Sequence, residues 1–588
     1  MNTLVIVLIA AVCLIAAYTL YGRWLAHKWG IDPQAKTPAV KYEDGEDFVP
    51  TDGWTVFSHQ FSSIAGAGPV TGAIQAAAFG WLPVLLWILL GGIFFGAVTD
   101  FGALYASVKN EGRSMGLLIE KYIGKTGRRL FLLFCWLFCC IVIAAFADMV
   151  AGTFNAYTVT DGVTSLAATA DSNSAAGMVS IMFMVFAVIY GLIQRKCRFT
   201  GWKESVMAIV FIVLCFALGM QFPLVAGKQT WSYITFIYIF FAAVTPIWIL
   251  KQPRDYMTTF MFIAMIACAA VGLLVAHPAM NLPVFTGFNN AKLGTMFPIL
   301  FVTVACGAVS GFHSLVSSGT SSKTVSNEKD MLKVGYGAMV LESLLAVLAL
   351  CVAGAAAAAD GTPAEGTPFQ IFSRGVAGFI SMFGISSHVA TVFMTMCVSA
   401  LALTSLDAVA RIARMSFQEL FSVDDMEHAE GWRKLFCNIY FSTILTLVFG
   451  YILTKVGYAN IWPLFGSANQ LLSALVLITL CVFLKVTGRS NKMLFPPLII
   501  MLFVTFTALV QRLIAMIKAI QTAAAVAIPA GETTWGAVFI ANGLQLIIAV
   551  LLIILGLTIV VNSAKSYINC KAENQDAVKK QGAAVHAN

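Results

Sequence analysis

The chain has 588 residues, of which 59% are hydrophobic and only 11% are charged. Soluble domains carry about 25% charged residues, so this composition excludes a soluble fold and indicates a helical integral membrane protein. The net charge of +8 does not indicate nucleic-acid binding, because the basic residues occupy short loops between apolar runs. The 13 cysteines follow no metal-ligand spacing, and we expect them to act as small apolar side chains.

About fifteen apolar segments are long enough to cross a bilayer. They fall near residues 4–22, 54–80, 82–108, 130–154, 177–194, 203–219, 231–250, 258–276, 297–318, 333–358, 386–410, 435–454, 460–484, 495–517 and 535–562. The first segment lacks a basic leader and a cleavage site, so we expect an uncleaved span. The shorter apolar stretch at residues 369–383 predicts an interfacial or re-entrant helix.

Basic residues concentrate in alternate loops. The loops rich in Lys and Arg are residues 109–129, 194–203, 251–254, 323–333, 411–434 and 485–492. Residues 155–177, by contrast, contain neither Lys nor Arg. Because cytoplasmic loops carry an excess of Lys and Arg, the basic loops are predicted to be cytoplasmic. The N-terminus then lies outside, and the C-terminus lies in the cytoplasm.

The second segment is interrupted in its middle, where residues 59–72 read HQFSSIAGAGPVTG. Three glycines and a proline within residues 66–72 do not favour a continuous helix. Irregular backbone survives in hydrocarbon only where protein or a water-filled cavity satisfies its polar groups. Many secondary transporters build substrate and ion sites from such broken helices. The alternative is that the glycines simply permit close helix packing.

The backbone after this break is suited to bind an anion. Pro69 favours the first helical position, which would leave the amides of Val70, Thr71 and Gly72 without partners. These amides and the positive end of the helix dipole predict a carboxylate site. A cation would instead be served by the carbonyl groups of residues 62–65. The predicted substrate contacts from this segment are Gly66, Ala67, Gly68, Pro69, Val70 and Thr71.

Segment 231–250 is predicted to oppose this break. Counting segment 54–80 as the first of ten makes 231–250 the sixth, running the opposite way, as in two inverted five-helix repeats. A proline interrupts it as well, so Pro246 and Trp248 complete the predicted substrate site. The halves show no clear residue-level similarity. The predicted divisions are a first helix and loop (1–53), two repeats (54–222 and 223–415), accessory helices (416–564) and a cytoplasmic tail (565–588).

Segment 297–318 leads into SGFHSLVSSGTSSK, residues 310–323, which is unusually rich in hydroxyl groups for a membrane helix. Ser317, Ser318 and Thr320 are candidate ligands for a sodium ion, although hydroxyls often bond back to their own helix. His313 in the same stretch favours a proton instead, because histidine titrates near neutral pH and is costly in a span unless paired or hydrated.

Further ionisable side chains fall within spans, at Asp100, Asp148, Glu342, Asp407 and Arg411. Asp100 and Asp148 are candidate proton carriers, unless a basic partner silences them. Asp407 and Arg411 are four residues apart, which predicts a structural or gating salt bridge. His59 precedes the break and is expected to line the cytoplasmic pathway.

Motifs of soluble enzymes are missing from the sequence. It contains no HExxH, Walker-type, CxxC or GxSxG pattern, so we predict neither enzymatic activity nor a metal site. A membrane sensor is disfavoured because no inner loop is long enough for an output domain, and a channel would not accumulate a solute against its gradient.

Three motifs together resemble the carbon starvation protein A family of bacterial inner-membrane transporters. They are HQFSSIAGAGPVTG at 59–72, WILKQPRDY at 248–256 and SGFHSLVSSGTSSK at 310–323. Asp100-Phe101 is also similar, and the likeness runs from about residue 54 past residue 410. The resemblance implies the amino acid–polyamine–organocation superfamily, with a LeuT-like 5+5 inverted-repeat core and about five additional transmembrane helices. It also implies proton-coupled pyruvate import, or peptide uptake during nutrient limitation.

We therefore expect an all-α polytopic inner-membrane protein that imports a small carboxylate, pyruvate first, by proton symport with alternating access. Proton- or sodium-coupled uptake of peptides or amino acids is the alternative. The candidate coupling residues are His59, Asp100, Asp148, His313, Ser317, Ser318 and Thr320. No cofactor is predicted beyond the co-transported ion, and the expected partners are the carboxylate and the lipid bilayer, not nucleic acid.

Overall fold

The computed structural model describes residues 2–45, 48–160, 163–197, 201–246, 249–290, 293–422, 430–525 and 542–570. Its strands form two short hairpins, which pair β1 (Tyr157–Thr160) with β2 (Val163–Leu166) and β3 (Asn289–Asn290) with β4 (Gly294–Thr295). Within the described residues, 11 helices are long and apolar enough to cross a membrane, or 12 with one bent pair. The prediction of an all-α polytopic membrane protein is confirmed.

These long helices correspond to predicted spans. The uninterrupted ones are α9 (Lys125–Thr153), α10 (Ala170–Cys197), α11 (Trp202–Gln221), α13 (Lys251–Ala276), α19 (Ser387–Phe421), α22 (Tyr458–Val486), α23 (Phe495–Ala525) and α25 (Leu544–Asn569). Three more continue through a π-helical turn: α1 (Thr3–Ala16) through Ala17–Gly22 into α2 (Arg23–Trp29), α6 (Trp81–Gly91) through Gly92–Gly96 into α7 (Ala97–Lys109), and Leu332–Gly337 into α17 (Ala338–Ala356). The bent pair is α20 (Gly431–Cys437) with α21 (Ile439–Thr454).

The remaining predicted spans, 54–80, 231–250 and 297–318, are broken or short helices. Three further helices are too short to span: α3 (Pro38–Lys41), α8 (Met115–Ile123) and α18 (Pro368–Ser381). The last is the separate helix predicted at residues 369–383, and it begins with a capping box in which Thr367 and Gln370 exchange hydrogen bonds.

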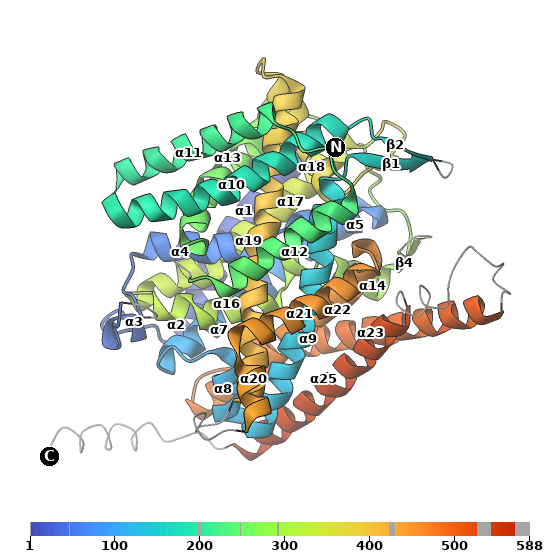
Figure 1. The fold of residues 1–588 in the computed structure, drawn as a ribbon. Coiled ribbons are helices and arrows are strands. Elements are labelled where there is room, and N and C mark those ends of the chain that lie inside the picture. The colour runs from blue at the N-terminus through green and yellow to red at the C-terminus, as the bar shows by residue number, and fades with distance from the viewer. Residues whose placement is uncertain are drawn as a thin grey trace.

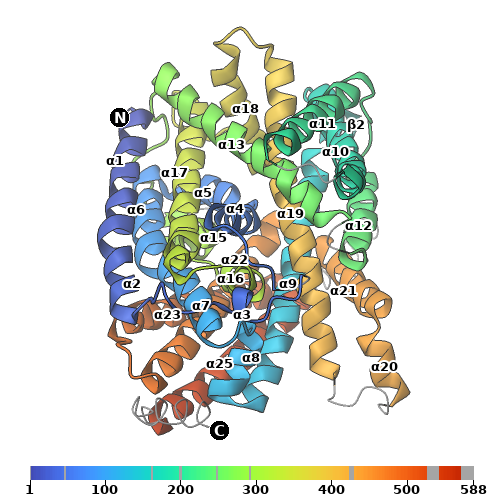
Figure 2. The same cartoon turned by 90° about the vertical axis from the view of Figure 1, so that its left-hand side faces the viewer.

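Two long helices run through the middle of the bundle. α9 and α19 pack against each other, with α10, α11 and α13 grouped on one side and α23 and α25 on another (Figure 1). α1 lies along the edge of the molecule beside α6 and α17 (Figure 2). α22 packs on α9, α7 and α16, and its apolar stretch is wholly buried within the protein. The division of the chain into repeats and accessory helices stays a prediction, but α22, counted there as accessory, lies inside the core.

The predicted break in segment 54–80 is present. α4 (Gly53–Ile64) ends before the non-helical residues 65–67, and α5 (Gly68–Ala76) follows. A Cβ atom at Gly68 would lie 2.3 Å from the Cys306 sulfur, and one at Gly72 would lie 2.6 Å from the Thr303 carbonyl oxygen. The glycines therefore serve close packing as well as the interruption, so both interpretations of this segment hold.

The helix that meets this break is itself broken. It consists of α14 (Met296–Thr303), α15 (Ala305–Ala308) and α16 (Gly311–Gly319), and α5 packs on both α14 and α15. The expectation that segment 231–250 opposes the break is wrong. α12 (Lys228–Val244) does end before Pro246, but it packs on α9, α19 and α21, and Pro246 is exposed. Trp248 lies outside the described residues.

The end of α12 has a local explanation. Its last turn leaves carbonyl groups without helical partners, and Arg411 of α19 donates to the carbonyl oxygens of Ala242 and, at 2.6 Å, Thr245. A proline after a helix can thus mark a capped terminus and not a substrate site.

Candidate proton and substrate site

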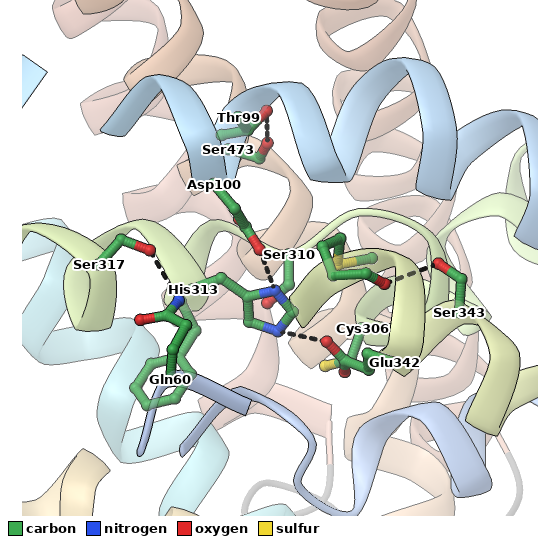
Figure 3. A network of polar contacts seen from close by, with 12 residues as sticks. Gln60, Thr99, Asp100, Cys306, Ser310, His313, Ser317, Glu342, Ser343 and Ser473 are labelled. Carbon is green, nitrogen blue, oxygen red and sulfur yellow. Dashed lines mark hydrogen bonds and ion pairs between the residues drawn. The ribbon is translucent and has the colours of Figure 1, made fainter. Parts of the chain in front are cut away.

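His313 lies between two carboxyl groups in the interior of the bundle (Figure 3). Its Nδ1 is 2.9 Å from an oxygen of Asp100, and its Nε2 is 3.3 Å from an oxygen of Glu342. The side chains of the three residues are at most 1% exposed. Asp100 comes from α7, His313 from α16 and Glu342 from α17, so three separate helices build this acid–histidine cluster. The structure thus brings together two predicted proton candidates, Asp100 and His313, and adds Glu342.

The cluster has an excess of acidic groups for its surroundings. Two ionised carboxylates around a neutral imidazole would place two uncompensated negative charges in the interior, at a cost of several kcal/mol each. Asp100 Oδ1 and both oxygens of Glu342 are buried without a hydrogen-bond partner among the described residues. Protons on the cluster remove this cost, so the arrangement is chemically suited to take up and release protons.

A small cavity joins the cluster to the break in α4–α5. Its volume is about 20 Å³, room for one water molecule. Gly66 and Gly68 border it from the break, and His313 borders it from α16. The other lining residues are Ile64, Phe138, Val142, Phe146, Cys306, Phe312, Ser405, Val409, Phe465 and Asn469. The predicted substrate segment and the predicted proton residue therefore share one wall.

The free amides of the break differ from the predicted set by a few residues. α5 begins at Gly68 and not at Pro69, so the Thr71 amide donates to the Ala67 carbonyl oxygen at 3.0 Å. Thr71 and Gly72 therefore lie within helical hydrogen bonding, and that part of the prediction is wrong. Among the described residues, the amides of Ala67, Gly68 and Val70 have no partner.

Two amide side chains that sequence reasoning missed support the site. Gln60 of α4 donates to the Ser317 hydroxyl at 2.8 Å and accepts from Ser321 at 2.6 Å. Asn469 of α22 accepts from the Phe312 amide at 3.1 Å and donates to Ser310 at 3.0 Å. Both are fully buried, and the signal that could have revealed them is an amide side chain within an apolar segment.

The hydroxyl groups of α16 do not converge on an ion site. Ser317 serves Gln60, and the Ser318 hydroxyl donates back to the Ser314 carbonyl oxygen at 2.7 Å. Thr320 is exposed at the end of the helix. The alternative that such hydroxyls bond back to their own helix therefore holds for Ser318.

Two other predicted coupling residues lie away from the cluster. Asp148 pairs with Lys228 at 2.8 Å and accepts from the Tyr458 amide at 2.8 Å. His59 is exposed on α4 and does not border the cavity, so its role in a cytoplasmic pathway stays a prediction.

We expect Asp148→Asn to keep proton-driven uptake within about twofold of wild type, because the carboxylate has a basic partner and does not contact the cluster. Initial uptake rates in liposomes measure this effect. A loss as large as that of a His313 variant would return Asp148 to the coupling site.

The predicted Asp407–Arg411 salt bridge has a different partner. Asp407 contacts the guanidinium of Arg254 and accepts from the Tyr238 hydroxyl at 2.8 Å. Arg411 instead caps α12, as described above. The pairing joins α13, α12 and α19, and the i, i+4 spacing alone could not reveal it because Arg254 is distant in sequence.

Broken membrane helices that enclose a buried acid–histidine cluster define an integral membrane transporter. The chain belongs to the carbon starvation protein CstA family, whose model matches residues 2–361 and 355–508.

Relatives of known name agree with this class. The peptide transporter CstA of Escherichia coli (strain K12) is 32% identical over 568 residues, which cover 82% of this chain and 77% of the relative. The pyruvate/proton symporter BtsT of the same organism is 36% identical over 354 residues, 58% of this chain and 47% of the relative. Among solved structures, the Eremococcus coleocola manganese transporter aligns over 89% of this chain and 99% of its own, with 10% identity and a TM-score of 0.47. A likeness that weak does not define the helix arrangement, which rests on the contacts described above.

Proposed function

We propose that the protein imports a small carboxylate, pyruvate first, together with a proton. One observation carries this proposal: His313 and the glycines of the break line the same cavity. A solute at the break would therefore lie within a few ångströms of the protonated cluster, and its charge and that of the proton would stabilise each other.

The carboxylate would bind the amides of Ala67, Gly68 and Val70 at the positive end of α5. Binding a negative charge there favours retention of a proton on the cluster, and loss of either ligand weakens binding of the other. The cavity holds one water and not a carboxylate, so the helices around it must separate to load and unload. Alternating access supplies that movement.

The lining of the cavity supports pyruvate over larger solutes. Phe138, Phe146, Phe312 and Phe465 offer apolar contact for a methyl group, and the confined volume favours a compact anion. Peptide uptake is the second candidate, because the relative that covers most of the chain carries that name. Proton coupling is favoured over sodium because Ser318 bonds to its own helix and Thr320 is exposed.

The basic loops support an orientation with the N-terminus outside and the C-terminus in the cytoplasm of a bacterial cell. Lys109 and Glu328, from two of these loops, form a salt bridge of 2.6 Å, which joins the ends of α7 and the α17 span at one face of the bundle.

Purified protein in liposomes tests the function. We expect labelled pyruvate to accumulate when the outside is acidic, to ignore a sodium gradient at equal pH, and to resist competition by di- and tripeptides. Accumulation that follows sodium would move the coupling ion, and efficient competition by peptides would move the substrate.

A further inference from the structure

The two broken helices carry the same short motif. Residues 68–72 read GPVTG in α5, and residues 307–311 read GAVSG where α15 joins α16. The two copies face each other, since the Cys306 sulfur lies against Gly68 and a Cβ atom at Gly307 would lie 3.5 Å from the Cα atom of Pro69. Residue-level similarity between the halves therefore exists, although it pairs segment 54–80 with 297–318.

The similarity continues into the next helix of each half. A π-helical turn follows in both, at Gly92–Gly96 and at Leu332–Gly337. Each turn ends at a glycine, and a carboxyl residue follows closely: Asp100 comes four residues after Gly96, and Glu342 comes five residues after Gly337. The two acids that flank His313 thus occupy related positions of two repeats.

The packing of the repeats is reciprocal. α16 of the second repeat packs on α7 of the first, and α5 of the first packs on α17 of the second. Likewise, α4 contacts the second π-helical turn, and α15 contacts the first. Six predicted spans lie between the two broken helices, so they run in opposite directions. This is the relation of inverted repeats, which exchange conformations between the two open states of a transporter.

The two acids differ in depth. The Lys109–Glu328 salt bridge places the end of α7 and the start of the other span at one level, on the face with the basic loops. Asp100 is nine residues from Lys109, about 13 Å along the helix, whereas Glu342 is fourteen residues from Glu328, about 21 Å. Asp100 is therefore nearer the basic, predicted cytoplasmic face.

From this placement we infer that Glu342, His313 and Asp100 form an ordered proton relay across the pseudo-symmetric centre, an inference that rests on the proposed function. Glu342 receives the proton from the outer side, and Asp100 releases it towards the cytoplasm. In the transfer step, the Glu342 carboxyl O–H bond breaks as Nε2 of His313 gains that proton. The Nδ1–H bond then breaks as Asp100 gains the second proton, and one proton has moved inward. Rotation of the neutral ring restores its starting tautomer.

The cluster contains the groups that such a relay needs. The electrostatic neighbours of Asp100 and Glu342 are each other, His313 and the buried thiol of Cys306. His313 itself belongs to only one repeat, because Ile74 stands at the corresponding position after GPVTG. A single shared carrier between two related acids permits directional transfer.

The test compares Asp100→Asn and Glu342→Gln in liposomes by two assays, with Asp148→Asn as the control for loss of a buried carboxyl group. The first assay is net pyruvate uptake driven by an inward proton gradient, and the second is pyruvate exchange at equal pH. We expect both variants to lose net uptake by at least about tenfold while exchange continues. External acidification should stimulate exchange in Asp100→Asn and not in Glu342→Gln. Asp100→Glu and Glu342→Asp should recover part of the net uptake.

Other outcomes separate the two proposals. If wild-type protein shows no uptake driven by a proton gradient, the proposed function fails, and the relay fails with it. If wild type is proton-driven but Glu342→Gln accumulates pyruvate normally, only the relay is wrong. An equal response of both variants to external acid would overturn the order of the two acids. A variant that has lost exchange as well, and that the conservative replacement does not rescue, would make that acid structural.

Discussion

Replacing His313 with glutamine is expected to lower proton-driven uptake about 100-fold, the scale of losing a group that transfers protons. Glutamine keeps hydrogen-bonding capacity in a similar volume, but it does not titrate. The two carboxyl groups, 2.9 Å and 3.3 Å from the imidazole in the wild type, would then have no carrier between them. Initial rates under an inward proton gradient measure the effect.

His388→Gln is the matched control, because His388 lies on α19 and contacts the Ser172 hydroxyl at 3.0 Å, outside the cavity. We expect this control to transport like the wild type. Should His313→Gln retain proton-driven accumulation, the acid–histidine cluster would not be the coupling site.

Gly68→Ala is expected to reduce uptake about 30-fold, corresponding to overpacking by about 2 kcal/mol. Gly68 begins α5 with a helical backbone, so alanine suits the conformation and the effect comes from contact. The added Cβ atom would lie 2.3 Å from the Cys306 sulfur and 2.4 Å from its Cβ atom. The broken helices would have to separate, and the free amides would move out of place.

A second substitution tests this reason directly. Cys306→Gly removes both clashing atoms, so the double variant should recover a large part of the uptake lost in Gly68→Ala. Gly378→Ala provides the control, because a Cβ atom there meets nothing within 4 Å. Equal loss in the double variant, with normal behaviour of the control, would mean that the glycine is needed for a reason other than this contact.

Much of the site could be predicted because its signals are local. Glycines and a proline within a few residues interrupt a helix wherever the helix packs, and the break at residues 65–67 lies where the composition placed it. Asp100 and His313 stood out for a similar reason, since an ionisable group in an apolar segment needs a polar partner. The two residues turned out to be partners of each other.

What escaped prediction depends on contacts between distant segments. Whether Pro246 or the 304–310 region opposes the break depends on helix packing, which the hydropathy of either segment does not encode. Asp407 illustrates the same limit, because Arg411 is four residues away yet Arg254 is its partner. Asp148 resembled Asp100 in sequence, and only the approach of Lys228 distinguishes them. Glu342 gained importance solely through its distance to His313.

The central claim is that proton and carboxylate bind beside each other and move together. The most direct measurement records both in the same liposomes, with a pH-sensitive dye inside and labelled pyruvate added outside at equal starting pH. Wild-type protein should acidify the lumen as pyruvate enters, and His313→Gln should not. Entry of pyruvate without a change in lumenal pH, or equal acidification by the variant, would contradict it.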